Sequence, residues 1–412
     1  MAGVKPFVAV RPKTEYADRV AALPYDVYNR QEAKQETEKE PLSFLRIDRA
    51  ETQFPDSVST YDAKVYQKAK EIYQDMKQKE IFIQDSQACY YIYQLIMDGR
   101  SQTGIVACAS VVDYLNNVIK KHENTREEKE QDRIRHVDTL SAQTGPIFLA
   151  YRSQQTINEI AKKVTENSRP LYDFTAEDGI GHKVWKINNP DDIGVIQDSF
   201  DKIGDIYIAD GHHRAASAVK VSLKRRKEHP DYTGKEEFNY FLSVLFPDDQ
   251  LMIMDYNRCV KDLNGLDKEA FLEKAGRHFS ITKLDKAEHP SRKGEVTMYL
   301  EKEWYLLTAS EELMQIEDAV ASLDVSLLQN YLLEPVLGIQ DPRVDERIDF
   351  IGGIRGLKEL EKRADSDMKV AFAMYPTSIA ELFAVADAGL LMPPKSTWFE
   401  PKLRSGLFIH EI

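Results

Sequence analysis

Five consecutive residues carry the clearest chemical signal in the chain: Asp210, Gly211, His212, His213 and Arg214. Two imidazoles and a guanidinium are donors suited to phosphate oxygens. The glycine lets the backbone approach a ligand closely. The aspartate can either cap a helix or hold a metal ion. Together these residue types predict a phosphate-binding site; the alternative is a capped, hydrogen-bonded turn that serves folding alone.

The flanking residues predict where this run lies in the fold. Residues 205–210 alternate in polarity as a strand does, and a helical pattern of apolar residues follows from Ala215 onward. A helix that begins directly after a strand presents unpaired backbone N–H groups and the positive end of its dipole, which attract anions. We therefore expect a strand-to-helix turn with phosphate as its ligand.

A second candidate is His122 beside Glu123. A carboxylate next to an imidazole can act as a general base, and the plainer alternative is a solvated surface pair. The segment 389–396 nearly spells a phosphate loop, but Pro394 stands where the motif needs glycine and offers no N–H. The segment 352–356 does not match a dinucleotide-binding motif.

Composition narrows the class of protein. The chain has 412 residues, of which 42% are hydrophobic and 30% charged, which is typical of a globular protein of two or three domains. A net charge of −13 argues against general nucleic-acid binding. The three scattered cysteines predict neither a disulfide framework nor a cysteine zinc site. We expect no signal peptide, no spanning helix and no membrane partner, and hence a cytoplasmic location.

Helical and strand patterns are mixed along the whole chain, so the fold class is predicted to be α/β to α+β. Expected elements include a helix over 61–79, a short strand at 44–47, and two strands at 90–95 and 103–112 joined by a hairpin turn. A domain boundary is predicted between 247 and 248. It would separate domain 1–247 from an α+β domain 248–412 that packs against it.

The N-terminal strand, over 7–10, is predicted to share a sheet with residues 205–210. That arrangement would bring Arg11, Asp26, Glu123 and Asp210 into one cleft, within reach of a single substrate.

Ordered sequence pieces carry a family resemblance. They are FVAVRP near the start, LPYDVY at 23–28, FLRID at 44–48, HENT at 122–125, DRIRHV followed by GPIFLAY at 145–151, ADGHHR at 209–214, and the ending MPPKSTWFEPKLRSGLFIH. With these pieces the chain resembles the bacterial and archaeal DUF1015 proteins. The GHHR turn also resembles the phosphate-binding element of the ParB/sulfiredoxin-like superfamily, which includes free-serine kinases.

The resemblance implies roles for individual residues. Domain 1–247 would be a ParB-like mixed-sheet domain that binds nucleotide phosphates. The implied residues are Gly211, His212, His213 and Arg214 for phosphate; Glu123, Asp210 and His212 for catalysis; Arg11, Asp26 and His122 for substrate; and Asp210 for Mg²⁺. Because His212 and His213 replace the sulfiredoxin cysteine, sulfinic-acid repair is not expected.

Three functional hypotheses follow from these patterns. The first is a kinase that uses ATP or ADP with Mg²⁺ to phosphorylate the hydroxyl of free L-serine or a similar metabolite. The second is a nucleotide-binding regulatory module without metabolite kinase activity. The third is another enzyme that binds a phosphorylated metabolite at the turn. A phosphate site is common to all three, so the motif does not separate them. The expected partners are a nucleotide and a small molecule, and a homo-oligomer remains open.

Overall fold

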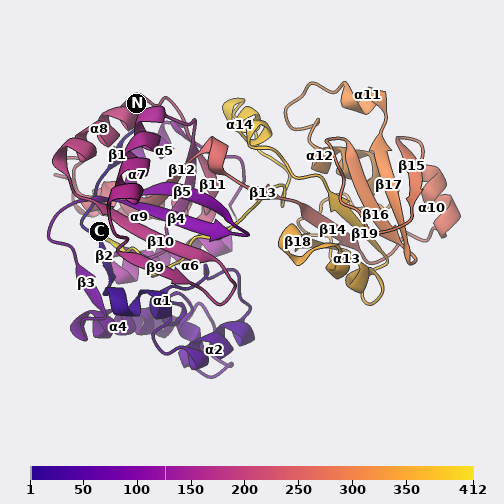
Figure 1. The fold of residues 1–412 in the computed structure, drawn as a ribbon. Helices are drawn as coiled ribbons and strands as arrows, with labels where there is room; N and C mark the ends of the chain where they lie inside the picture. Colours follow the sequence, from indigo (N-terminus) through magenta and orange to yellow (C-terminus); the bar gives the residue numbers. More distant parts are fainter. Residues whose placement is uncertain (1, 126) are drawn as a thin grey trace. The chain divides into compact units, whose positions relative to one another are not determined.

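The computed structural model describes residues 2–125 and 127–412. The chain divides into two compact units (Figure 1). The first unit runs to Leu251 and also includes Pro401–Ile412, and the second unit is Met252–Glu400. The predicted boundary between 247 and 248 lies close to the end of the first stretch. The prediction assigned residues 401–412 to the C-terminal domain, whereas the structure places them in the first unit.

A nine-stranded mixed sheet forms the centre of the first unit. Its order is β6 (Ile119–Lys120), β11 (Ile206–Asp210), β8 (Ile147–Tyr151), β12 (Tyr240–Pro247), β5 (Arg100–Ser110), β4 (Tyr90–Met97), β10 (Gly181–Ile187) and β9 (Tyr172–Thr175), with β1 (Val4–Lys5) paired to β5. β6 is parallel to β11 and β8 is parallel to β12, while the other pairs are antiparallel. The hairpin predicted around residues 98–101 is the β4–β5 pair.

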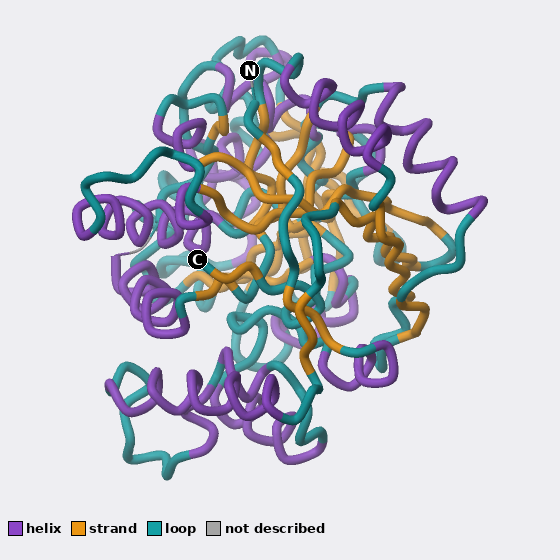
Figure 2. Tube along the Cα trace, turned by 90° about the vertical axis from the view of Figure 1, so that its left-hand side faces the viewer, coloured by secondary structure: helices purple, strands orange, loops and turns teal. Residues whose placement is uncertain are grey.

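Helices lie around the strands in the backbone trace (Figure 2). The apolar side chains between this sheet and its helices form one continuous core. These helices are α5 (Val111–Leu115), α7 (Gln155–Asn167), α8 (Pro190–Asp201) and α9 (His212–Glu228). The core combines sheet residues such as Ile105 and Leu149 with helix residues such as Phe200 and Ala218. α9 is thereby fixed against the sheet, and its N-terminus stands at the end of β11.

A second, mainly helical core lies within the first unit. It contains α1 (Ala17–Val20), α2 (Arg30–Lys39), α3 (Leu45–Asp48), α4 (Ala63–Gln78), α6 (Glu127–Leu140) and the pair β2 (Val10–Pro12) with β3 (Phe82–Gln84). The helix predicted at 61–79 is α4. The strand predicted at 44–47 is wrong, because these residues begin the short helix α3. Leu45 and Ile47 are buried there in the core that contains α4, and tertiary packing overrides the strand propensity of so short a run.

The last residues of the chain are built into the first unit. β21 (His410–Glu411) pairs with β7 (Ala142–Gln143), and Ile409 forms a bridge with Val10. Phe408 is fully buried, and its ring centroid lies 5.1 Å from that of Tyr91 and 6.1 Å from that of Tyr93. The C-terminal segment therefore contributes aromatic contacts as well as backbone pairing.

Replacing Phe408 by alanine is expected to lower the free energy of unfolding of the first unit by about 3–5 kcal/mol, because a fully buried aromatic ring would leave a cavity. Chemical denaturation followed by circular dichroism measures this change. Val195→Ala, at an exposed apolar position on α8, is the control and should leave the unfolding midpoint nearly unchanged. Equal effects of the two variants would contradict the buried role of the C-terminal segment.

The second unit contains a six-stranded antiparallel sheet. Its order is β15 (Phe279–Leu284), β17 (Glu303–Ala309), β16 (Glu295–Leu300), β19 (Val370–Met374), β14 (Tyr256–Val260) and β18 (Ile348–Gly352). A separate two-stranded pair joins β13 (Ile253–Met254) to β20 (Trp398–Phe399). The α-helices of this unit are α10 (Lys268–Ala275), α11 (Glu311–Met314), α12 (Asp324–Leu328), α13 (Leu357–Ala364) and α14 (Ile379–Asp387). Helices and sheets in both units confirm the predicted α/β to α+β class.

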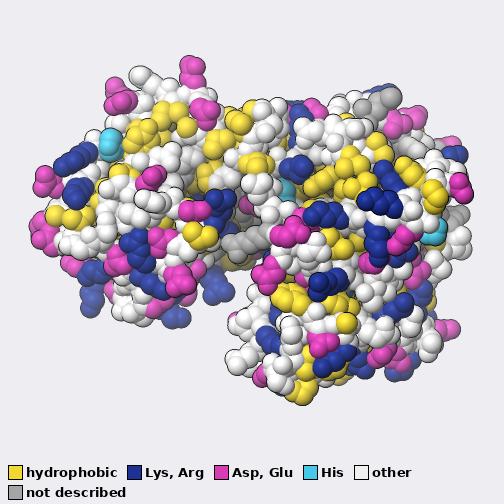
Figure 3. Space-filling model, turned by 180° about the vertical axis from the view of Figure 1, so that it is seen from behind, with side chains coloured by type: hydrophobic (Ala, Val, Ile, Leu, Met, Phe, Trp, Pro, Cys, Tyr) yellow, Lys and Arg dark blue, Asp and Glu magenta, His cyan; other side chains and the backbone are white. Residues whose placement is uncertain are grey.

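Charged side chains of both signs are interspersed over the face drawn in Figure 3. A single basic footprint of the kind that duplex-binding proteins present is not visible on that face. None of the described helices combines the length and apolar character needed to cross a bilayer.

Candidate functional site

The run 210–214 forms the predicted turn between a strand and a helix. β11 ends at Asp210, and α9 begins at His212. Gly211 lies between them with φ 93° and ψ 32°, a left-handed conformation that favours glycine. A Cβ at this position would lie 3.0 Å from guanidinium atoms of Arg214. The glycine thus permits both the turn and the close approach of the arginine.

Two cations hold the carboxylate of Asp210. Its Oδ2 lies 3.4 Å from Nη2 of Arg214 and 3.7 Å from Nζ of Lys402. Burial alone would raise the pKa of Asp210, but the positive charges of Lys402 and Arg214 hold that pKa well below its usual range. Asp210 is therefore ionised at neutral pH, and two positive side chains stand beside the start of α9.

His212 connects the turn to the His122–Glu123 pair. The backbone N–H of His122 donates to Nε2 of His212 over 3.5 Å, so neutral His212 carries its proton on Nδ1. That Nδ1 lies 3.7 Å from Oε2 of Glu123. The rings of His122 and His212 meet edge to face with centroids 4.5 Å apart. The structure thus brings a carboxylate to the first residue of α9.

Both of these histidines are buried and neutral at physiological pH. Burial lowers the pKa of His122 to about 4. Burial, together with the neighbouring His122, lowers the pKa of His212 well below its usual value. His212 can therefore donate from Nδ1 to Glu123 or to a ligand without carrying a charge itself.

The other two residues of the run differ in their surroundings. Arg214 donates from Nη1 to the carbonyl of Pro146, a contact that fixes its guanidinium near Asp210. His213 is half-buried, and its carbonyl accepts a hydrogen bond of 2.6 Å from the hydroxyl of Ser217. The guanidinium of Arg214 is thus oriented by its contacts with Pro146 and Asp210.

The structure places the two remaining predicted substrate residues elsewhere. Arg11 lies on β2, outside the large sheet, and donates to Asp85 from Nε and Nη2 at 3.1 and 2.8 Å and from Nη1 to the hydroxyl of Tyr172 at 3.4 Å. Its donors are engaged in that buried ion pair. Asp26 lines a pocket beside α4 and not the turn. The predicted strand over 7–10 does not join the sheet of β11: Val10 begins β2, which pairs with β3 in a separate sheet, and the N-terminal strand that does join the large sheet is β1 (Val4–Lys5).

Sequence reasoning missed several residues that lie beside the site. They are Asp48, Arg133 and His136, which line a pocket together with Arg214. All of these residues fall within the sequence pieces that carry the family resemblance. Their positions in those pieces were the available signal, but no periodicity or spacing indicates that segments so distant in sequence meet.

The metal prediction has limited support from the side chains. Within the described chain, His, Cys, Asp and Glu form no cluster of three or more that could hold a metal ion. Mg²⁺ commonly binds through one or two carboxylates, with phosphates and waters completing its shell. Asp210 fits that mode as a single carboxylate, although Lys402 and Arg214 already neutralise its Oδ2.

Comparison with known proteins agrees with the sequence pieces. The family described as "Protein of unknown function (DUF1015)" matches residues 4–326. The chain belongs to the DUF1015 family. A search of curated proteins finds no match.

Solved structures similar to this DUF1015 protein include SbnI with a C-terminal truncation from Staphylococcus aureus. It is 12% identical, with a TM-score of 0.38, and covers 72% of this chain and 82% of its own. A variant of a free serine kinase in complex with ADP is 12% identical, with a TM-score of 0.35, and covers 72% and 87%. A free serine kinase in complex with AMP is 13% identical, with a TM-score of 0.34, and covers 72% and 86%. Likenesses at this level do not assign chemistry to this chain.

The buried histidines predict how stability depends on pH. Because His122 has a pKa of about 4 in the folded state and about 6.5 when unfolded, the unfolded chain binds its proton first as pH falls. The free energy of unfolding should therefore drop by about 1.5 kcal/mol between pH 6.5 and pH 5 from this residue alone. His122→Gln should flatten that slope in urea denaturation, whereas His229→Gln, at an exposed histidine, should preserve it.

Proposed function

We propose that this DUF1015 protein is a nucleotide-dependent phosphotransferase acting on the hydroxyl of a small metabolite, with free L-serine as the first acceptor to test. The proposal rests on one distance: Oε2 of Glu123 lies 3.7 Å from Nδ1 of His212, the first residue of α9. Gly211 and Arg214 lie at the same end of this helix, where phosphate would bind. A phosphate site alone would explain binding. A carboxylate at its edge adds a group that can accept a proton.

The residues of the turn would bind the nucleotide phosphates. The first backbone N–H groups of α9 have no acceptor within the helix, and the helix dipole favours negative charge there. Arg214 and Lys402 add two positive charges beside Asp210. Phosphoryl transfer depends mainly on positioning and on neutralising the transferred group, and this arrangement supplies both. Asp210 would offer one oxygen to Mg²⁺, which supplies further charge neutralisation when bound.

Glu123 would act as the general base. As the acceptor oxygen attacks the terminal phosphorus, a new O–P bond forms and the bond from that phosphorus to the bridging oxygen of the nucleotide breaks. The hydroxyl proton passes to the carboxylate of Glu123, and the shortened nucleotide leaves with the bridging oxygen. His212 faces Glu123 through Nδ1, which keeps the carboxylate oriented toward the turn. The donor nucleotide in this proposal is ATP or ADP.

The direct test incubates the purified full chain with ATP or ADP, Mg²⁺ and L-serine, and measures phosphoserine by mass spectrometry. Product from the wild type that disappears in His212→Ala supports the proposal, provided that circular dichroism shows a folded variant. Nucleotide binding that depends on His212 without product from any hydroxyl-bearing metabolite would instead favour the regulatory module. Absence of both nucleotide binding and product would refute the phosphate site itself.

A further inference from the structure

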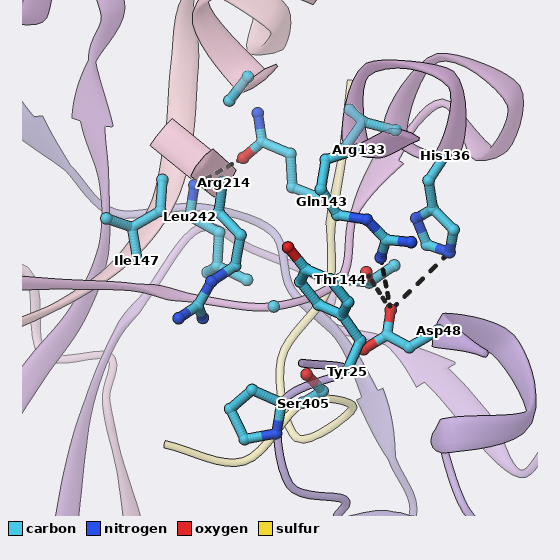
Figure 4. Close-up of a pocket in the computed structure, with 14 residues that line it drawn as sticks. Tyr25, Asp48, Arg133, His136, Gln143, Thr144, Ile147, Arg214, Leu242 and Ser405 are labelled. Carbon is cyan, nitrogen blue, oxygen red and sulfur yellow. Dashed lines mark hydrogen bonds and ion pairs between the residues drawn. The ribbon is translucent and has the colours of Figure 1, made fainter. Parts of the chain in front are cut away.

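Two pockets that share lining residues lie within the first unit, and Arg214 of the turn lines one of them. The first, here the α9 pocket, is lined by Pro24, Tyr25, Asp48, Arg133, His136, Val137, Gln143, Thr144, Gly145, Ile147, Arg214, Ala218, Leu242 and Ser405 (Figure 4). The second, here the α4 pocket, has about 920 Å³ of space between its walls, including its mouth. Tyr25, Asp48, Arg133 and His136 line both pockets. The α4 pocket and the α9 pocket therefore adjoin at these four residues.

Asp48 is a buried carboxylate with one oxygen left for a ligand. Only 5% of the residue is exposed. Its Oδ1 accepts a hydrogen bond of 3.0 Å from the hydroxyl of Thr144 and lies 3.8 Å from Nε2 of His136. No hydrogen bond or ion pair within residues 2–125 and 127–412 reaches its Oδ2. Oδ2 is not among the buried polar atoms that lack a partner, so it is accessible from the pockets that Asp48 lines and can accept from a ligand donor.

His136 offers a second acceptor to the same space. Its Nε2 donates to the carbonyl of Ile47 over 3.2 Å, so the proton of the neutral ring is on Nε2. Burial, aided by the neighbouring Arg133, lowers the pKa of His136 and keeps the ring neutral. Nδ1 is then an acceptor, and none of the described side chains or backbone groups donates to it. Asp48 and His136 together can receive two N–H groups of one ammonium.

Arg133 supplies the opposite charge. Its Nε and Nη2 bind Oδ2 of Asp132 at 2.9 and 2.8 Å, and its guanidinium lies 4.0 Å from the ring centroid of Tyr25. Among the residues that the structure describes, the one partner of its Nη1 is Oδ1 of Asp48, at 4.0 Å. In Figure 4 the Tyr25 ring lies between the side chains of Arg133 and Arg214. Arg133 can therefore bind an anionic group through Nη1 while it keeps its ion pair.

The mixture of charges selects the class of ligand. Asp26, Asp48, Glu51 and Asp132 line the α4 pocket together with Arg49, Lys129 and Arg133. A polyanion such as a nucleotide phosphate would meet these carboxylates at close range, which is unfavourable in a poorly solvated site. A small molecule that carries both an ammonium and a carboxylate can pair its ammonium with the acidic side chains and its carboxylate with the basic ones.

We propose that the junction of the two pockets binds an α-amino acid, with its ammonium on Asp48 and His136 and its carboxylate on Arg133. The proposal rests on the proposed function for one step only, the use of the amino acid's side-chain hydroxyl as the phosphoryl acceptor on the Arg214 side. The amino acid would enter through the α4 pocket, while the nucleotide occupies the turn. Acceptor and donor thus have separate binding residues.

The test measures binding by calorimetry to the full chain without nucleotide, so it does not depend on turnover. L-Serine leads a panel of L-amino acids, compared with 3-hydroxypropanoate, which lacks the ammonium, and ethanolamine, which lacks the carboxylate. The wild type should bind at least one amino acid, and removal of either charged group should weaken binding about 10- to 100-fold, as expected for charge-assisted hydrogen bonds. This ligand series requires no substitution.

Asp48→Asn locates the site. It keeps the size of the side chain and an oxygen for Thr144, but should weaken amino-acid binding about 10- to 100-fold and abolish the preference for L-serine over 3-hydroxypropanoate. Asp113→Asn is the matched control: Asp113 is a half-buried carboxylate that accepts from the backbone of Gly3 and lines neither pocket. ATP binding, measured in parallel, should be unchanged in both variants.

The outcomes separate this inference from the proposed function. Amino-acid binding that depends on Asp48, without phosphorylated product, would support the pocket and refute the phosphotransferase. Phosphoserine formation by Asp48→Asn with a wild-type KM would support the phosphotransferase and overturn the pocket. A panel in which no amino acid binds the folded wild type would also overturn the pocket, as would loss of ATP binding in place of amino-acid binding.

Discussion

Arg214→Ala is expected to slow phosphoryl transfer by about 10²–10³-fold, the loss typical of removing one preorganised donor from a transition state. The guanidinium is held by the carbonyl of Pro146 and by Asp210 before any ligand arrives. Binding a phosphate therefore costs little further side-chain conformational entropy. The kcat for phosphoserine formation should fall more than the KM for nucleotide rises, because charge develops on the transferred group during the reaction.

Two further variants show whether the arginine acts through charge or through shape. Arg214→Lys keeps the charge but lacks the planar fork that reaches two acceptors, so we expect it to recover only part of the lost rate. Lys227→Ala removes an exposed cation near the other end of α9 and should leave kcat unchanged. Wild-type turnover in Arg214→Ala would remove this residue from the proposed mechanism.

Glu123→Gln is expected to reduce transfer by about 10²–10⁴-fold while nucleotide binding persists, because an amide has the shape of the carboxylate but cannot take the hydroxyl proton. The two effects are separable: rapid-quench kinetics measure phosphoserine formation, and calorimetry measures ATP affinity. Binding should stay within a few-fold of the wild type, since Glu123 faces Nδ1 of His212 and its negative charge does not favour phosphate.

Glu166→Gln provides the control for a change of carboxylate to amide on an exposed helix surface. It should retain full activity and full nucleotide affinity. Joint loss of transfer and nucleotide binding in Glu123→Gln would indicate that the carboxylate organises the turn through His212. In that event the proton acceptor would have to be sought among other groups, and Glu123 would be a positioning residue.

The turn was predictable from the sequence because all of its determinants are local. A strand pattern, a glycine and a helical pattern occur in sequence around residues 205–214, and Gly211 adopts the left-handed conformation that only a glycine accepts easily. The nearness of Glu123 to His212 was also predicted, through the order of motifs along the chain.

The pocket beside the turn was not predictable in the same way. Asp48 ends the short helix α3, which reads as a strand in sequence, and Arg133 and His136 belong to a highly charged stretch typical of a solvated helix face. Their side chains are buried because α6 packs between α4 and α9. The local sequence pattern of α6 does not indicate contacts with helices so distant in sequence. The prediction that Arg11 lies in the cleft was wrong for the same reason: its ion pair with Asp85 joins residues distant in sequence, and no local pattern indicates it.

The return of residues 401–412 to the first unit has a consequence for biosynthesis. Lys402, which holds Asp210, and Phe408, which packs on Tyr91, leave the ribosome only after the whole of Met252–Glu400 has been translated. Domains tend to fold as they emerge, so the intervening unit can mature while the first still lacks its final strand. A nascent chain stalled before Lys402 would carry the proposed phosphate turn without one of the two cations beside Asp210, and would gain that cation only after the second unit had been translated.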